Sequence, residues 1–543
     1  MAEETEVLVV GAGPTGLTLA AGLLLRGIRV RVIDQAERAD PHSKAVILWP
    51  RALEAMAALG VGEEVFERGV KVVASSYYTG DQLLGRLAMR PLTGTRFPMA
   101  VSLPQNSTER LLREAVERLG GTVEFDAKLT GLTQDEDGAV ATLADGRTIR
   151  AAWVAGCDGA HSTVREQTGV AFEGGTYPQT FVLVDGEYDT DYVHNESYYV
   201  LHKAGVIVVL GLPDGLYRVF CSVPPGRNVE DAEATVREMV AEHSPRKLEQ
   251  VRSTGSGIFR VHRKQAQQLR IGRVLLAGDA AHIHSPAGGL GLNTGVEDAH
   301  SLAWRLAGIL RGTATEAELD DWETERLHVA KQVIADTDRQ TQMWMLQGWQ
   351  RTARDVAIDV GLRSGLIERF LPRRMSQLDL VLPARDAALG RPRLALPGAG
   401  PLRPGARIPD VPLDGERHLH DLFTAGGHLL LVVSADPAPL VAALGLTERP
   451  DPRTLQLVVL SDRPDYQGKV GELVRDRTGL LKQALRVPPE AVCLIRPDGV
   501  IATMTTPGDP VGRSRLRARL ATLVPATAKA ALARRNAPER KGR

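Results

Sequence analysis

The sequence predicts an α/β protein, with a Rossmann-like domain interleaved with a separate β-sheet domain and a small α/β domain after them. Three observations lead to this fold class. A strand, a glycine-rich turn, a helix and a second strand follow one another from Glu6 to Asp34, short apolar strands dominate residues 180–270, and strand and helix signals alternate again beyond residue 404. With 543 residues, 43% of them apolar, the chain is long enough for two or three domains with their own cores.

The N-terminal unit has the pattern of a dinucleotide-binding fold. The apolar strand 7–10 runs directly into the turn GAGPTG. In such a turn Gly11 permits the tight bend, Gly13 lets the backbone approach a pyrophosphate, and Gly16 allows the helix to pack closely on the strand. The helix that follows carries an apolar stripe and stops at Gly27. Its N-terminus would direct free N–H groups at phosphate.

Asp34 completes this unit, because it ends the second strand 18 residues after Gly16. A carboxylate at this place accepts hydrogen bonds from a ribose 2′-hydroxyl and repels a 2′-phosphate. The unit therefore predicts a nucleotide site, but it does not distinguish NAD from the ADP half of FAD.

The composition excludes several kinds of partner. Sixty-six basic and 66 acidic side chains cancel, so no overall charge attracts nucleic acid or a membrane surface. The N-terminus lacks the basic segment of a signal peptide and no apolar run is long enough to span a membrane, so we expect a cytoplasmic protein. Cys157, Cys221 and Cys493 are too few and too far apart for a CxxC pair or a cysteine zinc site, and we interpret them as reduced core thiols.

The segment after the first unit combines a loop, a helix and a hairpin. Residues 38–45 form a polar loop that can reach back to the nucleotide, and residues 50–60 have a proline start, helix formers and a glycine stop. Residues 72–100 carry glycines and little helical periodicity, which predicts a hairpin excursion. We expect its Tyr77 and Tyr78 to line a second site.

A further helix is predicted after Pro104, with Ser107 or Thr108 as its cap. Turn signals at residues 135–138 and 144–146 then separate short strands. These elements continue the α/β pattern toward the middle of the chain.

The middle of the chain changes character twice. Residues 153–165 read as a strand that runs into a turn and a helix. From 180 to 270 the pattern is one of short apolar strands, such as 206–212 and 217–223, with one helix near 231–242. This region predicts a separate, sheet-based domain.

A second buried strand ends at Asp279 and leads into a glycine-rich loop at 286–293, where a flat ligand can lie against the backbone. Thr294 with Glu297 predicts a capping box for the next helix. Long helical segments then continue to about residue 371.

The last part of the chain is set apart by composition. Residues 382–412 are rich in proline, glycine and arginine, which is typical of a linker. Buried strands at 429–433 and 455–460 and a hairpin at 491–501 indicate a small α/β domain. The basic tail after residue 513 is predicted to be a solvated end.

Three motifs now stand in order along the chain: GAGPTG with Asp34, CDGAHSTVR, and AGDAAHIHSPAGGLGLN. Together they resemble the motifs of the single-component FAD-dependent aromatic hydroxylases, the family of para-hydroxybenzoate hydroxylase, phenol hydroxylase and the bacterial aromatic polyketide hydroxylases. The resemblance covers roughly residues 5–375. The segment from about Pro404 to Thr522 is similar to the thioredoxin-like C-terminal domain of the phenol hydroxylase and polyketide hydroxylase branch.

This resemblance implies a division of the chain into an FAD-binding domain (1–75, 98–179 and 271–385), a substrate-binding domain (76–97 and 180–270), a linker (386–404), a thioredoxin-like domain (405–524) and a basic tail (525–543). Cys493 is the only cysteine of the thioredoxin-like domain. Because disulfide exchange needs two thiols, we expect this domain to support packing or oligomerisation, and a homodimer is compatible with that role.

The resemblance also assigns residues to the cofactor. The glycine turn would hold the pyrophosphate and Asp34 the adenosine ribose, while the AGDAAH motif and the loop after it would hold the ribityl chain and face the isoalloxazine. The Asp158 motif is associated with both FAD and NAD(P)H. The residues so assigned are Gly11, Gly13, Pro14, Thr15, Gly16, Asp34, Gln35, Lys44, Gln105, Asp158, Arg165, Gly278, Asp279, Pro286, Gly288, Gly289, Gly291, Leu292 and Asn293. N–H groups of Leu292 and Asn293 would stabilise the negative charge of a reduced flavin.

The sequence departs from the family pattern at three positions. Lys44 stands where many members carry an arginine, Leu290 where the polyketide branch usually has glutamine, and His300 where it usually has asparagine. Lysine keeps the charge of arginine but loses its planar fork. We interpret His282 and His284 as structural, because no set of ligands completes a metal site.

The resemblance implies an external monooxygenase. NAD(P)H, as NADH or NADPH, would reduce FAD, O₂ would add at flavin C4a, and the hydroperoxide would pass one oxygen to a phenolic, polyketide-like ring. Epoxidation, Baeyer–Villiger insertion and inactivating oxidation of a drug stay open at this point. So do an FAD-dependent reductase that does not use oxygen and a flavin-binding protein without enzymatic activity.

Overall fold

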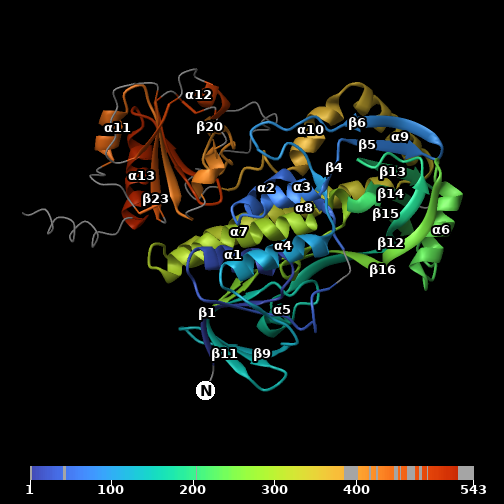
Figure 1. Cartoon of the computed structure of the whole chain (residues 1–543), viewed down its shortest axis with the longest axis horizontal. Helices are drawn as coiled ribbons and strands as arrows, with labels where there is room; N and C mark the ends of the chain where they lie inside the picture. The colour runs from blue at the N-terminus through green and yellow to red at the C-terminus, as the bar shows by residue number, and fades with distance from the viewer. Residues whose placement is uncertain are drawn as a thin grey trace, which may run out of the picture. The chain divides into compact units, whose positions relative to one another are not determined.

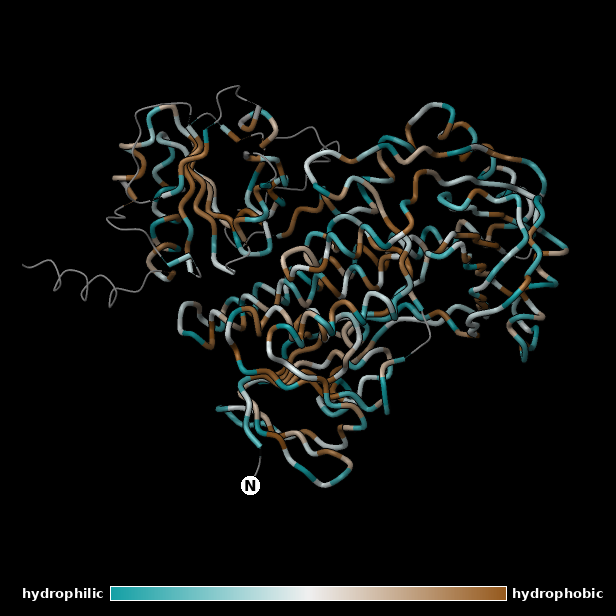
Figure 2. The backbone as a smooth tube through the Cα atoms, viewed as in Figure 1, coloured by the Kyte–Doolittle hydropathy of each residue, from teal (hydrophilic) through white to brown (hydrophobic). Residues whose placement is uncertain are grey.

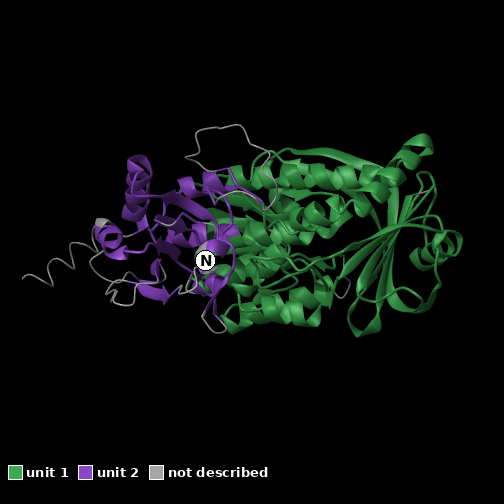
Figure 3. Cartoon of the chain, turned by 90° about the horizontal axis from the view of Figure 1, so that it is seen from above, with its two compact units in different colours: residues 1–300, 323–379 green, residues 301–322, 380–543 purple. Residues whose placement is uncertain are grey.

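The structure is a computed structural model, and it describes residues 3–40, 44–203, 205–383, 402–414, 417–423, 426–444, 451–452, 454–461, 471–475, 480–485, 487–488 and 490–523. The chain divides into two compact units, residues 1–300 with 323–379 and residues 301–322 with 380–543 (Figure 3). The first unit contains the predicted substrate-binding residues and most of the predicted FAD-binding residues, whereas residues 301–322 and 380–385 of the predicted FAD-binding domain fall in the second unit. The boundary between those two predicted domains stays a prediction. Most of the predicted linker 386–404 and the whole tail 525–543 lie outside the described residues.

The first sheet of the first unit is the predicted nucleotide-binding sheet. Its strands lie in the order β17-β18-β11-β1-β2-β8, with β10 and β9 attached beside β11, and the five strands from β18 to β8 run parallel (Figure 1). The bounds are β1 Glu3–Val10, β2 Val30–Ile33, β8 Val123–Glu124, β9 Leu129–Gln134, β10 Ala139–Leu143, β11 Thr148–Gly156, β17 Arg270–Ile271 and β18 Val274–Leu276.

Helix α1 (Pro14–Leu25) connects β1 to β2 as the sequence predicts. It ends before Gly27, whose φ of +69° is accessible to glycine at little cost. The helix is buried from Gly16 to Leu23, more widely than the predicted stripe, because α4 (Gln105–Arg118) packs beside it. Because a sheet covers α1 on one side and a helix covers it on another, few of its residues face solvent.

The second sheet has eight strands in the order β19-β16-β12-β15-β14-β13-β5-β6. Its bounds are β5 Ala74–Thr79, β6 Gln82–Ala88, β12 Phe172–Thr190, β13 Glu196–His202, β14 Gly205–Gly211, β15 Tyr217–Val223, β16 Leu248–Ala266 and β19 His282–Ile283. The predicted hairpin excursion is confirmed as β5 and β6. A small sheet of β3 (Ile47–Leu48), β7 (Val101–Ser102) and β4 (Val70–Lys71) completes the strands of this unit in the described residues.

The expectation of uniformly short strands in this region was wrong for β12 and β16, which have 19 residues each. The sequence of β12 contains turn signals, including Gly174-Gly175, Pro178 and Asp185-Gly186. At these positions the strand continues, and its pairing with β16 shifts in register between Thr176 and Thr180 and again at Asp185. A bulge lets a strand bend and continue where a turn would have reversed it.

The remaining helices of the first unit include those that the sequence predicts and one, α3, that it did not. They are α2 Pro50–Ala57, α3 Gly62–Arg68, α5 Thr163–Thr168, α6 Ala232–His243, α7 Gly291–Leu310, α8 Ala317–Trp344, α9 Gly348–Arg363 and α10 Leu366–Met375, with the end of α7 and the start of α8 falling in the second unit. The carboxylate of Asp231 caps α6 by accepting from the N–H groups of Glu233 and Ala234. Among the described residues, no helix combines the length and the hydropathy that crossing a bilayer requires.

Two predicted helix caps were wrong, because both helices begin earlier than the sequence indicates. Helix α4 begins at Gln105 with Pro104 as its N-cap, so Ser107 and Thr108 lie inside its first turns and cap nothing. In α7, the Thr294 hydroxyl donates to the carbonyl of Leu290 at 2.9 Å, four residues back. That bond belongs to a helix interior and not to a capping box.

The second unit contains a five-stranded mixed sheet in the order β24-β23-β22-β25-β26. The three central strands β23, β22 and β25 are mostly apolar, as the brown tubes in Figure 2 show. This sheet is compatible with the expected thioredoxin-like domain. The bounds are β20 Pro412–Asp414, β21 Arg417–His418, β22 His428–Val433, α11 Pro437–Ala443, β23 Leu455–Ser461, β24 Glu472–Arg475, α12 Leu480–Leu485, β25 Ala491–Ile495, β26 Ile501–Thr505 and α13 Pro510–Leu523.

Cys493 lies fully buried in β25, opposite Leu431 of β22. Burial raises the pKa of this thiol to about 12, so it stays protonated at neutral pH. We expect Cys493→Ala to leave turnover unchanged and to lower the free energy of unfolding by about 1 kcal/mol, the cost of losing one small buried group. Steady-state turnover and urea unfolding measure both effects. Cys221→Ala removes an equally buried thiol from the first unit as a control, and a folded Cys493→Ala protein without activity would contradict the prediction.

Candidate active site

The first unit contains a cavity of about 1120 Å³ that is lined by the segments following strands of the first sheet, by strands of the second sheet and by the loop before α7. Many of the predicted cofactor residues line it: Gly13, Pro14, Thr15, Gln35, Lys44, Gln105, Asp158, Asp279, Pro286, Gly288, Gly289, Gly291 and Leu292. The other predicted residues lie beside the cavity without lining it: Gly11, Gly16, Asp34, Arg165, Gly278 and Asn293.

The three glycines of the GAGPTG turn differ in what a side chain at their position would contact. Gly11 has φ +104°, and a Cβ there would overlap the carbonyl group of Cys157. A Cβ on Gly16 would overlap the carbonyl oxygen of Gly11. Gly13 has an ordinary φ of −74°, and a Cβ there would meet no protein atom within 4 Å. The protein itself therefore does not need a glycine at position 13, whereas a ligand that approaches the backbone does.

Asp34 fastens this turn to the end of β2. Its Oδ2 accepts from the N–H of Ala12 at 2.7 Å, and its Oδ1 accepts from the N–H of Ala36 at 2.8 Å. A carboxylate has further lone pairs, so these two bonds leave acceptor capacity for a ribose hydroxyl. The predicted ribose contact of Asp34 stays a prediction.

The Asp158 motif is tied together by side-chain bonds to the backbone. Asp158 accepts from the Ser162 hydroxyl at 2.5 Å and from the N–H of Val164 at 3.1 Å, at the start of α5. Arg165 is buried and donates to the carbonyls of Ala280 and Ala160, each at 2.9 Å. Arg165 thus connects α5 to the turn that presents Asp279, and its predicted contact with a cofactor stays a prediction.

Behind that turn lies a buried cluster of charges centred on Asp298. Its Oδ2 accepts from the N–H of Gly278 at 3.0 Å and from Nε2 of His282 at 2.7 Å, and its Oδ1 accepts from Nε of Arg326 at 2.5 Å. Burial by itself would raise the pKa of Asp298, but Arg326 and His282 outweigh it and hold the pKa at about 2. An ionised Asp298 fixes the backbone at Gly278, so the turn that carries Asp279 has one defined position.

Burial shifts the pKa values of two side chains that line the cavity, Asp279 and His284, in the direction that favours their neutral forms. Burial raises the pKa of Asp279, which lines the cavity. Burial lowers the pKa of His284 to about 4, and its Nδ1 pairs with the carbonyl of Ser285 at 2.9 Å, so His284 is neutral with Nδ1 as the donor. His282 pairs with Asp298 in the buried cluster, which agrees with the structural role inferred from the sequence.

The loop before α7 is held against β3 and the start of α2. The indole N–H of Trp49 donates to the carbonyl of Gly288 at 2.8 Å. The Asn293 side chain accepts from the N–H of Trp49 at 2.7 Å and donates to the carbonyls of Ile47 and Gly289 at 2.9 and 2.7 Å. Asn293 is buried and acts through its side chain as a clamp on the loop, a role the sequence did not indicate.

The N-terminus of α7 faces the cavity through Leu292. The first N–H groups of a helix have no acceptor inside the helix and carry its partial positive charge. The arrangement therefore suits a planar group with negative charge near Gly291 and Leu292.

The sequence departs from the family pattern at three positions. Of these, Leu290 and His300 are buried and do not line the cavity, whereas Lys44 lines it.

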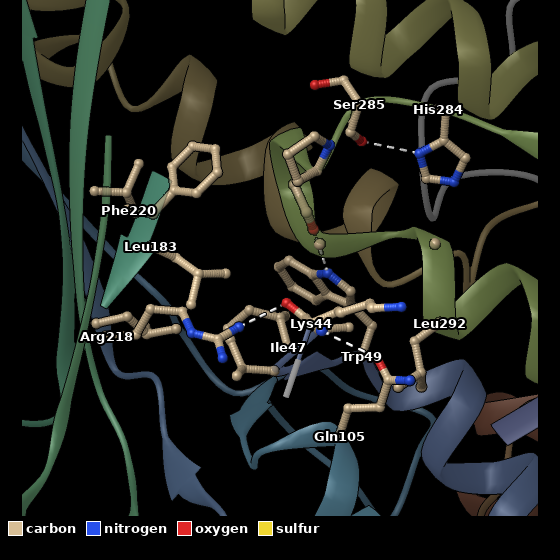
Figure 4. Close-up of a pocket in the computed structure, with 18 of the residues that line it drawn as sticks. Lys44, Ile47, Trp49, Gln105, Leu183, Arg218, Phe220, His284, Ser285 and Leu292 are labelled. Atoms are coloured by element: carbon tan, nitrogen blue, oxygen red, sulfur yellow. Dashed lines mark hydrogen bonds between the residues drawn. The ribbon is translucent and has the colours of Figure 1, made fainter. Parts of the chain in front are cut away.

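Arg218 of β15 is a site residue that sequence reasoning missed. It pairs with Asp185 of β12 through two bonds of 2.7 Å, and its Nη1 donates to the carbonyl of Lys44 at 2.6 Å (Figure 4). Gln105 supports the same loop by accepting from the N–H of Ala45 at 3.1 Å. A single arginine inside the apolar strand YRVFCSV was the available signal, because a charge in a buried strand needs a partner.

The wall of the cavity opposite the α7 loop is the second sheet. Figure 4 shows Leu183, Arg218 and Phe220 on one side of the cavity and His284, Ser285 and Leu292 on the other. Of the two tyrosines expected to line a second site, Tyr77 lines the cavity, whereas the prediction for Tyr78 was wrong. Successive side chains of a strand point to opposite faces, so Tyr78 packs in the core on the far face of the sheet and accepts from Arg246.

Comparison with known proteins shows a family match, two relatives and a similar solved structure. Residues 4–337 match the family model described as FAD binding domain. The 6-methylpretetramide 4-monooxygenase of Streptomyces rimosus is 33% identical over 96% of this chain and 94% of its own. A rifampicin monooxygenase of Streptomyces venezuelae is 38% identical over 69% of this chain and 79% of its own. The solved anhydrotetracycline hydroxylase of Streptomyces rimosus superposes with a TM-score of 0.75 at 29% identity, over 96% of this chain and 99% of that structure.

Proposed function

The chain belongs to the family of FAD-dependent aromatic hydroxylases, and from that premise we propose that it uses NAD(P)H and O₂ to hydroxylate a planar, phenolic, polyketide-like substrate. It is an FAD-dependent monooxygenase. The substrate, the use of O₂ and a cytoplasmic location belong to the proposal. Its three cysteines are unpaired and buried, as in a protein of a reducing compartment.

One observation carries the proposal: a single cavity has cofactor-type residues on one side and an apolar sheet on the other. Ligand pockets commonly measure about 300–1,000 Å³. The cavity of about 1120 Å³ exceeds that range and has room for a flavin ring together with a substrate of several rings. A pocket for the cofactor alone would not need the second sheet.

The residues present fit FAD. Gly13 leaves open space for a pyrophosphate, Asp279 lines the cavity where it would hold the ribityl chain, and the backbone at Gly291 and Leu292 suits a ring whose reduced form is anionic. When bound, FAD supplies the redox chemistry. The chain binds and orients the two ligands, and its apolar wall of Leu183, Phe220 and neighbouring side chains excludes water from the reacting ring.

A second candidate is the inactivating oxidation of a drug. The relative from Streptomyces venezuelae carries the name rifampicin monooxygenase, and it shares 38% identity with this chain. Both candidates use the same cavity and cofactor, so only the product separates them. An incubation under ¹⁸O₂ with phenols, with tetracyclic phenols and with rifampicin, followed by mass spectrometry, shows which class of ligand gains an oxygen atom.

We expect a true substrate to accelerate flavin reduction. Within the described residues the chain has one dinucleotide unit, which FAD would occupy, so NAD(P)H would meet the flavin only transiently. A substrate that favours the flavin position exposed to NAD(P)H raises the population that can react. We predict a tenfold or greater increase in the anaerobic reduction rate, about 1.4 kcal/mol in the barrier, measured by stopped-flow bleaching with NADPH and with NADH. Equal rates with and without every candidate substrate would contradict substrate-gated hydroxylation.

A further inference from the structure

Three aromatic side chains that carry hydrogen-bond donors, two from the second sheet and one from the end of α8, lie together on the wall of the cavity. The rings of Tyr77 (β5) and Tyr199 (β13) stack with centroids 5.0 Å apart and planes 11° apart, and the ring of Trp344 lies 6.0 Å from that of Tyr199. All three residues line the cavity. Tyr77 is 8% exposed and Trp344 is 2% exposed. The three side chains form one aromatic cluster whose polar atoms are a phenol, a second phenol and an indole N–H.

Within the described part of the chain, the indole N–H of Trp344 is buried and has no hydrogen-bond partner. The hydroxyls of Tyr77 and Tyr199 make no bond to the protein either, but unlike the indole they are not sealed from the cavity that their side chains line. Leaving a buried donor unsatisfied costs about 1–3 kcal/mol, so native structures rarely do it without a reason. Other tyrosines of this sheet have partners: Tyr78 with Arg246, Tyr192 with Ser244, Tyr198 with Glu196 and Tyr217 with the carbonyl of Tyr192.

Tyr188 is a further tyrosine of this sheet whose hydroxyl is without a partner. It packs against the core on the far face of the sheet, together with Tyr78, and it does not line the cavity. Tyr77, Tyr199 and Trp344 therefore differ from it in position, because their neighbouring rings line one part of a ligand cavity.

The register of the sheet places the tyrosine pair at one end of an apolar row. Leu183 pairs with Phe220, Phe220 with Val208, Val208 with Tyr199, and Tyr199 with Tyr77. Because neighbouring strands lie about 4.8 Å apart, this row across five strands is about 19 Å long. A flat ligand of several fused rings can lie along such a row, and an oxygen on its edge then reaches the tyrosines.

We propose that Tyr77, Tyr199 and Trp344 form an oxygen-binding subsite of the substrate cavity, which takes a carbonyl or hydroxyl oxygen on the edge of a planar, fused-ring aromatic ligand. The inference rests on the proposed function and narrows its substrate class. Burial raises the pKa of Tyr77 and raises the pKa of Tyr199 to about 12, so both phenols are protonated donors at neutral pH. The subsite selects for oxygenated rings, since an oxygen-free ring leaves the three donors unsatisfied.

Two soluble probes that differ only in ring oxygens test the subsite: anthraquinone-2-carboxylate and anthracene-2-carboxylate. Each is titrated into the FAD-loaded enzyme, and the dissociation constant is read from the flavin absorbance difference. We expect the wild type to bind the quinone at least tenfold more tightly, and Tyr77→Phe and Tyr199→Phe each to lose roughly tenfold for the quinone and nothing for the anthracene. Equal binding of the two probes by the wild type, binding of neither, or equal losses for both probes in the variants would overturn the subsite.

Tyr78→Phe is the matched control, because Tyr78 is the next residue of the same strand and faces away from the cavity. It should leave both dissociation constants unchanged while losing its bond with Arg246. Tyr77→Phe and Tyr199→Phe should unfold at or above the wild-type temperature, since each removes a hydroxyl without a partner. Bleaching of the flavin by NAD(P)H is recorded on the same samples: its absence in the wild type counts against the proposed monooxygenase activity, whereas the probe titrations judge the subsite independently.

Discussion

The Gly13→Val variant is expected to purify as a folded, colourless apoprotein. A Cβ at this position meets no protein atom within 4 Å, and the φ of −74° is accessible to valine, so the chain itself tolerates the side chain. The same atoms fill the open space beside the N-terminus of α1, where a pyrophosphate would lie against the backbone. We expect the affinity for FAD to fall by at least about a hundredfold, or about 2.7 kcal/mol.

Absorbance at 450 nm after purification and titration with added FAD measure this loss. Gly508→Val is the matched control, because Gly508 also has open space around its Cβ but belongs to the second unit and does not line the cavity. Gly16→Val, by contrast, should fail to fold, since its Cβ would overlap the carbonyl oxygen of Gly11. A Gly13→Val protein that keeps its yellow colour would show that the cofactor does not approach this turn.

The Asp298→Ala variant is expected to lose about 3–5 kcal/mol of unfolding free energy, the usual cost of leaving one partner of a buried ion pair unpaired. In the wild type, Asp298 is fully buried and accepts from Arg326, His282 and the N–H of Gly278. Its removal leaves the Arg326 charge opposed by Glu297 at 3.9 Å and by the neighbouring Glu325. Guanidinium unfolding of the purified variant measures the effect, and Asp359→Ala, which breaks the exposed pair with Arg363, should change stability by less than about 0.5 kcal/mol.

The pH dependence of the same variant provides an independent test. The pKa of Asp298 is about 2 in the folded protein, below the value of about 4 for an unfolded aspartate. The folded state therefore binds fewer protons, and the contribution of Asp298 is fully present above pH 4 and is lost as the pH falls from about 4 to 2. Asp298→Ala should show a flatter loss of stability in this window, and identical acid unfolding of variant and wild type would contradict the assignment.

The sequence was a good guide to elements whose contacts are local. The unit from β1 to β2 was predicted nearly to its bounds, because a glycine turn, an apolar helix and a stop at Gly27 act within about 30 residues of one another. The hairpin β5–β6, helix α6 and strand β15 were predicted for the same reason. The predicted helix caps were less reliable. Several residues near Gln105 and near Gly291 could begin a helix, and which one does depends on what the first helical turn packs against.

By itself, then, the sequence determined the α/β fold class, the nucleotide-binding turn and the family, since each rests on residue types at short, fixed spacings. Only the tertiary structure decided which glycine is open to a ligand, that Asn293 and Asp298 act as clamps, and that Arg218 joins the sheet to the Lys44 loop. It also assembled one wall of the cavity from Leu183, Phe220, Val208, Tyr199 and Tyr77, on five different strands. The physical reason is that strand pairing brings distant residues into register, and side chains that meet only through pairing share no spacing that a sequence can display.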